Sequence, residues 1–263
     1  MGAGDGPQHS VASTEVTDVS IPRPSSGRVF EAVRPIRLAD ASVRGRLRLD
    51  ACARYLQDIA NDDARDAGTP NFTAWVARRT TIRVERFPEY LDAVALATWC
   101  SGIGPRWAER RYTVRGFGDD AGVIDAVTLW VHIDMATMKP IAVPEGFAEQ
   151  YGAAAQGRTV RARLHLPTRP PMERTLVQTP WPLRFVDFDV LGHVNNSVYW
   201  QIVEEQLAGR PSVRAPMTIT LEHHDAIDRG AEVTVAVAEQ SGGFDAWVTA
   251  DERVAAVVSA RAL

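Results

Sequence analysis

Two stretches of the chain carry apolar residues at the spacing of an amphipathic helix. The first runs from about Leu49 to Ala67 and the second from about Asn195 to Gly209. In both, apolar residues recur three or four positions apart, which places them on one face of a helix. They are Leu49, Cys52, Ala53, Leu56, Ile59 and Ala60 in the first stretch, and Val194, Val198, Ile202, Val203 and Leu207 in the second. The pattern predicts two helices, each with one buried face.

A series of strand-like segments follows each predicted helix, bounded by turns that contain Pro, Gly or Asp. After the first helix these segments are 75–87, 92–101, 106–116 and 121–134, and after the second they are 216–224, 232–240, 244–251 and 253–262. A short strand is also expected before each helix, at 29–36 and at 181–186. The order of strand, helix and antiparallel run therefore occurs twice. Two α+β halves are predicted, each with a long helix packed against an antiparallel sheet.

A repeated turn motif links the two halves. The segment 37–47 (RLADASVRGRL) aligns with 184–194 (RFVDFDVLGHV), so that Arg, Asp and Gly match at positions 147 apart. In the first turn Ser42 stands where the second has Asp189, and Arg46 stands where it has His193. Likewise Arg48-Leu49 stands where the second has Asn195-Asn196. The scaffold is repeated while the chemical groups differ, which predicts an activity confined to the second turn.

The chain is divided into four parts on this basis. Residues 1–28 are rich in Gly, Ser, Pro and Thr and are expected to form a disordered tail. The first half covers 29–149, a connector covers 150–180, and the second half covers 181–263. The region 135–180 contains six prolines, which oppose a continuous helix or a central strand.

Composition excludes several classes of function. The 29 Lys and Arg residues are interspersed with 33 Asp and Glu residues, and the net charge of −4 gives no footprint for nucleic acid. No apolar run approaches a membrane span, and the first 28 residues lack the features of a signal peptide, so a cytoplasmic location is expected. Cys52 and Cys100 have no metal-binding spacing, and neither a metal nor a cofactor is expected.

Several segments in order resemble the acyl-acyl-carrier-protein thioesterases, and the resemblance covers about 29–263. It is carried by 187–199 (DFDVLGHVNNSVY), 75–79 (WVARR), 97–102 (ATWCSG) and 129–141 (LWVHIDMATMKPI). It implies a tandem, or double, hotdog fold in which antiparallel sheets wrap two long helices. It also implies hydrolysis of a fatty acyl-carrier-protein thioester in fatty acid biosynthesis. The implied partners are the acyl carrier protein and its acyl thioester, and a homodimer is left open.

The chain departs from the plant members of this family at two positions. Leu191 stands where they have an Asn, and their later strand acid falls on Ala226. The neighbouring polar residues 222–225 (EHHD) could compensate, and His223 is taken as a substrate-binding candidate. The sequence does not fix the register of this strand, which decides the side chains that face the site.

The second turn supplies the catalytic candidates Asp189, His193 and Asn196. The backbone amide of Asn196, at the start of a helix, is expected to hold the thioester oxygen. Asp189 would act either as general base for water or as nucleophile, and its structural alternative is a turn carboxylate. His193 would orient a reacting group or transfer a proton, its alternative being a structural histidine. Asn195 is expected to cap the helix and contact substrate.

The opposite helix supplies two further candidates. If the helices pair in antiparallel fashion, the middle of the first helix approaches the second turn. Gln57 and Asp58 then become substrate-binding candidates. Because 204 minus 147 is 57, Glu204 would face the first turn, where no chemistry is expected.

Two other functions remain as alternatives. One is an acyl-coenzyme A thioesterase of the hotdog class, and the other is a non-catalytic acyl-binding or regulatory hotdog protein. The second is motivated by Leu191 and Ala226 in place of polar groups. The absence of a Gly-x-Ser-x-Gly motif opposes a serine hydrolase. Arg106, Arg110 and Arg111 are candidates for contact with an acidic carrier protein.

Overall fold

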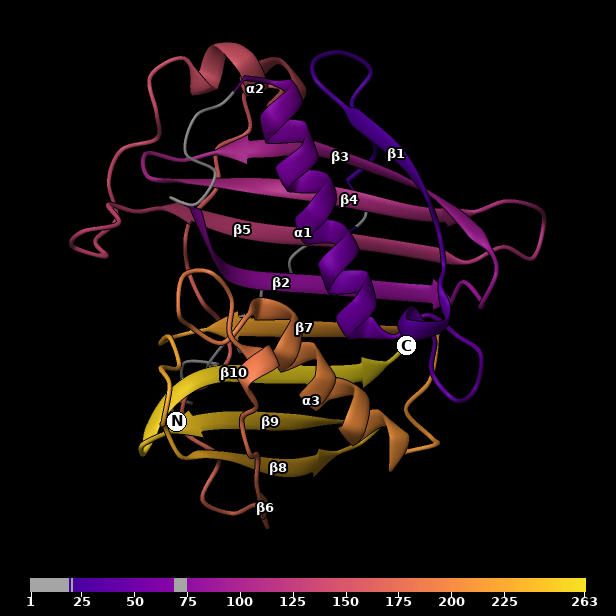
Figure 1. Ribbon diagram of the computed structural model, residues 1–263, viewed down its shortest axis with the longest axis vertical. Helices are drawn as coiled ribbons and strands as arrows, with labels where there is room; N and C mark the ends of the chain where they lie inside the picture. The colour runs from indigo at the N-terminus through magenta and orange to yellow at the C-terminus, as the bar shows by residue number, and fades with distance from the viewer. Residues whose placement is uncertain (1–18, 20, 69–74) are drawn as a thin grey trace, which may run out of the picture.

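The computed structural model describes residues 19, 21–68 and 75–263. Ten strands form one sheet in the order β1-β3-β4-β5-β2-β7-β10-β9-β8-β6, with every neighbouring pair antiparallel (Figure 1). The strands of the first half are β1 (Phe30–Pro35), β2 (Trp75–Arg86), β3 (Ala93–Ile103), β4 (Trp107–Gly116) and β5 (Val123–His132). Those of the second half are β6 (Val177–Pro180), β7 (Met217–His223), β8 (Val233–Gln240), β9 (Gly243–Ala250) and β10 (Arg253–Ala262).

Two helices, α1 (Leu49–Asp66) and α3 (Asn196–Ala208), lie on one face of this sheet and contact each other (Figure 1). Their apolar faces join the inward side chains of the strands in one hydrophobic core that extends through both halves. Both helices begin within a residue of the predicted positions. The apolar positions that recur along their sequences are buried in the structure or, for Ala53, partly buried. No helix among the described residues is long and apolar enough to cross a membrane.

The elements of the two halves recur at the spacing of 147 seen in the sequence. β1 begins at Phe30 and β6 at Val177, and the two helices begin at Leu49 and Asn196. The strand expected at 181–186 is wrong, because β6 ends at Pro180 and a 3-10 helix occupies Phe185–Asp187. β6 nevertheless starts where β1 plus 147 predicts, so alignment of the halves locates it better than local composition does.

β2 and β7 join the halves at the centre of the sheet. Six residue pairs form this ladder, from Arg79 opposite Glu222 to Val84 opposite Met217. Both strands also pair on their other side, β2 with β5 and β7 with β10. The junction is therefore an interior ladder rather than a contact between two sheet edges.

The connector contains a helix that its proline content did not suggest. α2 (Phe147–Ala155) spans the expected boundary at residue 149 and packs on β3. The absence of proline between Pro144 and Pro167 permits this helix. Phe147 and Tyr151 are buried in a small cluster with Cys100.

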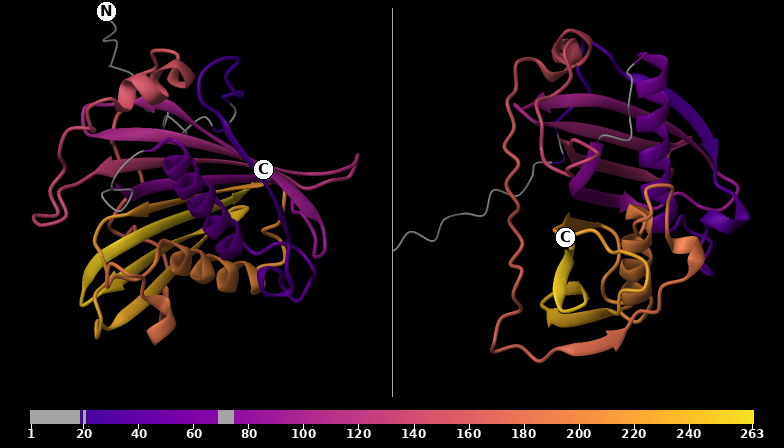
Figure 2. Two further views of the ribbon diagram at one scale, coloured as in Figure 1. Left: turned by 45° about the horizontal axis from the view of Figure 1, so that its top comes forward. Right: turned by 60° about the vertical axis from the view of Figure 1, so that its left-hand side comes forward.

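After α2 the chain crosses the sheet face that lies opposite the helices (Figure 2, right). Side chains from both halves hold its backbone: Trp107 donates to the carbonyl of Val160 at 2.8 Å, and Trp247 donates to that of Pro167 at 2.8 Å. We call residues 156–176 the strap. Of the expected tail, residues 1–18 and 20 lie outside the described residues.

Candidate active site

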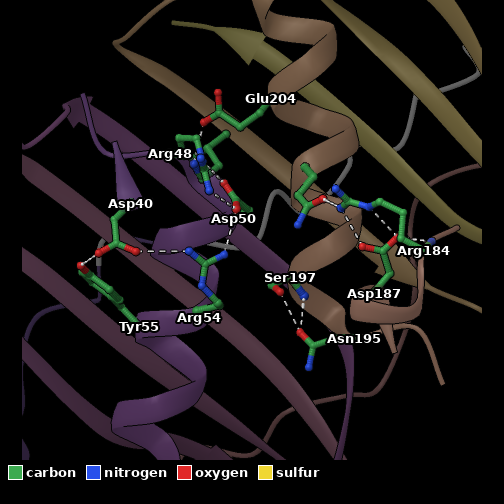
Figure 3. A network of polar contacts seen from close by, with 12 residues as sticks. Asp40, Arg48, Asp50, Arg54, Tyr55, Arg184, Asp187, Asn195, Ser197 and Glu204 are labelled. Carbon is green, nitrogen blue, oxygen red and sulfur yellow. Dashed lines mark hydrogen bonds and ion pairs between the residues drawn. The ribbon is translucent and has the colours of Figure 1, made fainter. Parts of the chain in front are cut away.

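The second turn is built on a frame that the first turn shares. Asp187 accepts hydrogen bonds from the backbone amide of Arg184 at 2.7 Å and from its guanidinium at 2.7 Å, and the Asp187 carbonyl accepts the Asn195 amide at 2.9 Å (Figure 3). Asp40 accepts the amide of Arg37 in the same way at 3.2 Å. The frame therefore has a structural role in both halves.

Asp189 makes one contact that the first turn shares and one that it lacks. Its Oδ1 accepts a hydrogen bond from the Leu191 amide at 2.9 Å, and Ser42 Oγ accepts the Arg44 amide at 3.2 Å at the equivalent place. Only Asp189 has a second oxygen, and this Oδ2 accepts from Asn195 Nδ2 at 3.3 Å. The hydrogen bond to the turn amide is common to both positions and is structural. The second oxygen, Oδ2, is present only at Asp189 and is not needed for that bond.

Asn195 caps α3, as expected. Its Oδ1 accepts hydrogen bonds from the Ser197 amide at 2.9 Å and the Ser197 hydroxyl at 2.8 Å (Figure 3). The next amide, that of Asn196, finds no acceptor within the part of the chain that the structure describes. A first-turn amide of this kind carries part of the positive end of the helix dipole and can hold a developing oxyanion.

His193 is held by an acid that sequence analysis missed. Its Nδ1 lies 2.9 Å from Oδ1 of Asp228, a residue of the loop between β7 and β8. The same loop reaches the turn through its backbone, since the amide of Val194 donates to the carbonyl of Ile227 at 3.1 Å. The Asp228 side chain is 71% exposed, so solvent screens the pair. The only signal in the sequence is an acid two residues beyond Ala226.

The register of β7 separates the polar residues at its end. His223 faces the helices, where its ring lies edge-on to Tyr199 with 4.8 Å between centroids. Burial, followed by the positive charge of Arg78, lowers the pKa of His223 to about 3, so the ring is neutral at physiological pH. Glu222 faces the strap and accepts the amide of His165 at 2.8 Å. Glu222 is therefore structural, and it does not replace the acid missing at Ala226.

The first turn is occupied by Glu204 of α3, which lies beside the start of α1 in Figure 3. Glu204 Oε1 accepts the amide of Leu49 at 2.6 Å, and both carboxylate oxygens accept from Arg46 at 2.8 Å. The expectation that Glu204 faces the first turn is confirmed. The equivalent of Glu204 on α1 is Gln57, and the equivalent of Leu49 is Asn196.

The remaining candidates lie elsewhere. Asp58 bonds Arg34 at 2.6 Å, so its carboxylate is engaged with β1 and we leave it out of the site. Arg110 and Arg111 are buried, which removes them as surface contacts for a carrier protein. Arg106 is exposed and keeps that role as a prediction.

Two hollows lie beside the helices. A polar groove of about 460 Å³ borders the occupied first turn and is lined by Arg48, Glu204 and Trp181 among others. A narrow, mainly apolar cavity of about 40 Å³ lies in the first half and is lined by Ala60, Trp130 and Tyr151 among others. The second is the more suitable for an acyl chain.

The sheet and helices define a protein of the hotdog-type fold class. A putative oleoyl thioesterase from Lactobacillus plantarum matches with a TM-score of 0.74 and 19% identity over 90% of this chain and 96% of that chain. A 12:0-ACP thioesterase from Umbellularia californica matches with a TM-score of 0.75 and 20% identity over 90% of this chain and 97% of that chain. At these identities the similarity establishes the fold.

Within this class, the chain belongs to the acyl-ACP thioesterase family and is a thioester hydrolase. Residues 27–151 match the acyl-ACP thioesterase N-terminal domain, and residues 172–258 match the C-terminal domain. An uncharacterized protein of Mycobacterium tuberculosis is 30% identical over 82% of this chain and 84% of its own length. A chloroplastic oleoyl-acyl carrier protein thioesterase of Coriandrum sativum is 22% identical over 73% of this chain and 59% of its own length.

Proposed function

We propose that the protein hydrolyses fatty acyl-[acyl carrier protein] to free fatty acid and carrier protein, with its chemistry confined to the second turn. The observation that supports this most directly is the difference between the two helix starts. At the first, the Leu49 amide is taken by Glu204 at 2.6 Å, whereas at the second, the Asn196 amide has no acceptor among the described residues. We also propose that the halves 29–149 and 181–263 are two hotdog units in tandem.

In this proposal the thioester carbonyl lies against the start of α3. Its oxygen accepts the Asn196 amide, which stabilises the negative charge that develops on that oxygen. Asp189 Oδ2 lies on the same turn, supported by Asn195. It either removes a proton from the attacking water or attacks the carbonyl itself. His193, held by Asp228, orients a reacting group or supplies a proton to the departing thiolate.

Gln57 is proposed to contact the substrate across the helix pair. Glu204 and Gln57 are equivalent by the spacing of 147, and Glu204 contacts the amide equivalent to that of Asn196. A neutral carboxamide at this place can donate to a carbonyl or a water, which a carboxylate cannot do. His223, buried and neutral beside Tyr199, is proposed to line the inner side of the same region.

The test is release of free thiol from acyl-carrier-protein and from acyl-coenzyme A, with Asp189→Asn and Ser42→Ala measured beside the wild type. Turnover that Asp189→Asn loses and Ser42→Ala keeps would support the second turn as the site. Equal loss in both variants would contradict it. Turnover of coenzyme A thioesters alone would favour the acyl-coenzyme A enzyme. Acyl binding without turnover would favour the binding protein.

General base and nucleophile are distinguished by a single turnover in water enriched in heavy oxygen. Attack by Asp189 forms an anhydride, and its hydrolysis at the aspartyl carbon leaves the label in the Asp189 carboxylate. Attack by water places the label directly in the fatty acid. Mass spectrometry of the peptide that contains Asp189 reads the result.

A further inference from the structure

The apolar cavity of the first half has a charged wall. It lies between α1, the strands β2 to β5 and α2, and its apolar lining includes Ala60, Ala64, Trp75 and Trp130. Two charged residues, Glu109 and Arg110, also line it. Glu109 is paired with Arg158 at 2.5 Å, and the Arg110 side chain is only 11% exposed. A guanidinium in the wall of a mainly apolar cavity is costly unless it is fully paired.

The partner of Arg110 is Asp63, on the last turns of α1. The two side chains are 2.5 Å apart, and that of Asp63 is 1% exposed. Asp63 also accepts from Arg28 Nε at 2.6 Å, while Arg110 donates to Thr98 Oγ1 at 3.3 Å and lies over the Tyr151 ring. Because both oxygens of Asp63 are engaged and Arg110 is paired, this wall offers little to a polar ligand. Displacement of either side chain of the pair would also leave a buried charge unpaired.

The cavity is aligned with the second turn along one face of α1. Gln57, Ala60 and Ala64 follow one another at intervals of three and four residues, which places them on a single stripe of the helix. At a rise of about 1.5 Å per residue, Ala64 lies about 10 Å beyond Gln57 along the axis. Asp63 neighbours Ala64, so the ion pair lies at the end of the stripe that is far from the second turn.

The positions in the second half that correspond to Ala60 and Ala64 carry larger residues. Ala60 corresponds to Leu207, which is buried in the core, and Ala64 corresponds to Pro211, beyond the end of α3 at Ala208. α1 is also longer than α3, with 18 residues against 13. The small residues and extra turn of α1 therefore provide space on the side that the second turn can use.

We propose that the buried ion pair between Asp63 and Arg110 is the end wall of the acyl site and sets the longest chain that the enzyme accepts. This inference rests on the proposed function. The substrate class it defines is a straight acyl chain that ends in a methyl group against the pair. Chains that reach past the pair are excluded because they would separate two buried charges, and chains that end in a hydroxyl or carboxyl gain no partner there.

Two variants test the wall in opposite directions. Ala64→Leu fills the cavity before the wall and is expected to lower kcat/KM by about 10-fold or more for the longest accepted chain, with short chains little changed. The double variant Asp63→Leu with Arg110→Leu replaces the pair by apolar side chains, which buried pairs often tolerate. It is expected to move the optimum to longer chains. Arg28 keeps Asp66 as its partner in that variant, at 2.6 Å.

The matched control is Glu222→Gln, which alters a fully buried carboxylate on the opposite face of the sheet. It is expected to change stability and leave the order of chain lengths intact. All variants are assayed on carrier-protein thioesters from butanoyl to stearoyl, with thermal unfolding to confirm folding. A wild-type profile that neither variant shifts, or that the control shifts equally, would overturn the inference.

A binding measurement separates this inference from the proposed function. Titration with free fatty acids of the same lengths measures the longest chain that binds, and it requires no turnover. If the wild type hydrolyses no thioester, the proposed function fails, and the binding series still shows whether the double variant admits longer chains. If hydrolysis occurs but the binding limit is the same in every variant, the wall is rejected and the proposed function stands.

Discussion

Glu204, on α3, accepts a hydrogen bond from the backbone amide of Leu49 at the start of α1, at 2.6 Å. The helix that begins at the proposed active site thus supplies the carboxylate that occupies the equivalent place at the start of α1. Arg46 adds two further bonds at 2.8 Å, in the position that His193 holds in the second turn. The first turn therefore holds an ion pair where the second turn holds the proposed reactive groups.

Glu204→Gln is expected to destabilise the protein by about 1–3 kcal/mol, because it leaves Arg46 without its charged partner in a partly buried place. Turnover per folded molecule should stay close to that of the wild type. Denaturant unfolding and thiol release check the two parts. Glu205→Gln, at an exposed neighbour, is the control. Loss of turnover at unchanged stability would show that Glu204 belongs to the chemistry.

Asp189→Asn is expected to keep the turn, since the amide oxygen can still accept from Leu191, and to lower kcat/KM by about 100-fold or more because the charged oxygen is lost. The midpoint of thermal unfolding should change little. Asp189→Ala should lose both the turn bond and the activity. A variant Asp189→Asn that turns over normally would assign Asp189 to the turn alone.

Asp228→Asn is expected to lower kcat by about 10-fold, a modest effect because solvent screens this exposed carboxylate. KM should change less than kcat, since Asp228 acts through the position of His193. The decisive measurement is a double-mutant cycle: in a His193→Gln background, Asp228→Asn should have no further effect. Additive losses would show that Asp228 acts independently of the imidazole.

His223 is expected to make the protein less stable in mild acid. Its pKa is lowered to about 3 in the folded state, against about 6.5 in the unfolded chain. The unfolded chain therefore binds more protons below about pH 6.5, and folding loses up to about 1.4 kcal/mol for each pH unit below that value. His223→Phe should flatten this part of the stability curve. The free energy of unfolding in urea, measured between about pH 7 and pH 5, tests this. A dependence on pH that is the same in His223→Phe as in the wild type would contradict the prediction.

The sequence predicted the elements that depend on local periodicity and on the repeat. The starts of α1 at Leu49 and α3 at Asn196, and the contact of Glu204 with the first turn, all follow from the helical pattern and the spacing of 147. Such features succeed because equivalent sequences in the two halves face equivalent surroundings. The capping role of Asn195 likewise depends only on its immediate neighbours.

What the sequence did not predict depends on contacts between distant segments. Asp228 reaches His193 only because a loop folds back over the turn, 35 residues later in the chain. The register of β7, which sends Glu222 to the strap and His223 to the helices, is set by pairing with β2 and β10. The proline content of the connector as a whole opposes a helix, whereas α2 lies in a stretch between Pro144 and Pro167 that contains no proline.

The interior ladder between β2 and β7 has a consequence for how the protein behaves on dilution. The proposed site combines the start of α3 with Gln57 of α1. If the two halves were separate chains, they would have to associate before these groups could meet. Here one continuous sheet in one chain holds both. Assembly of this site therefore needs no second molecule, and specific activity should stay constant as the protein concentration is lowered.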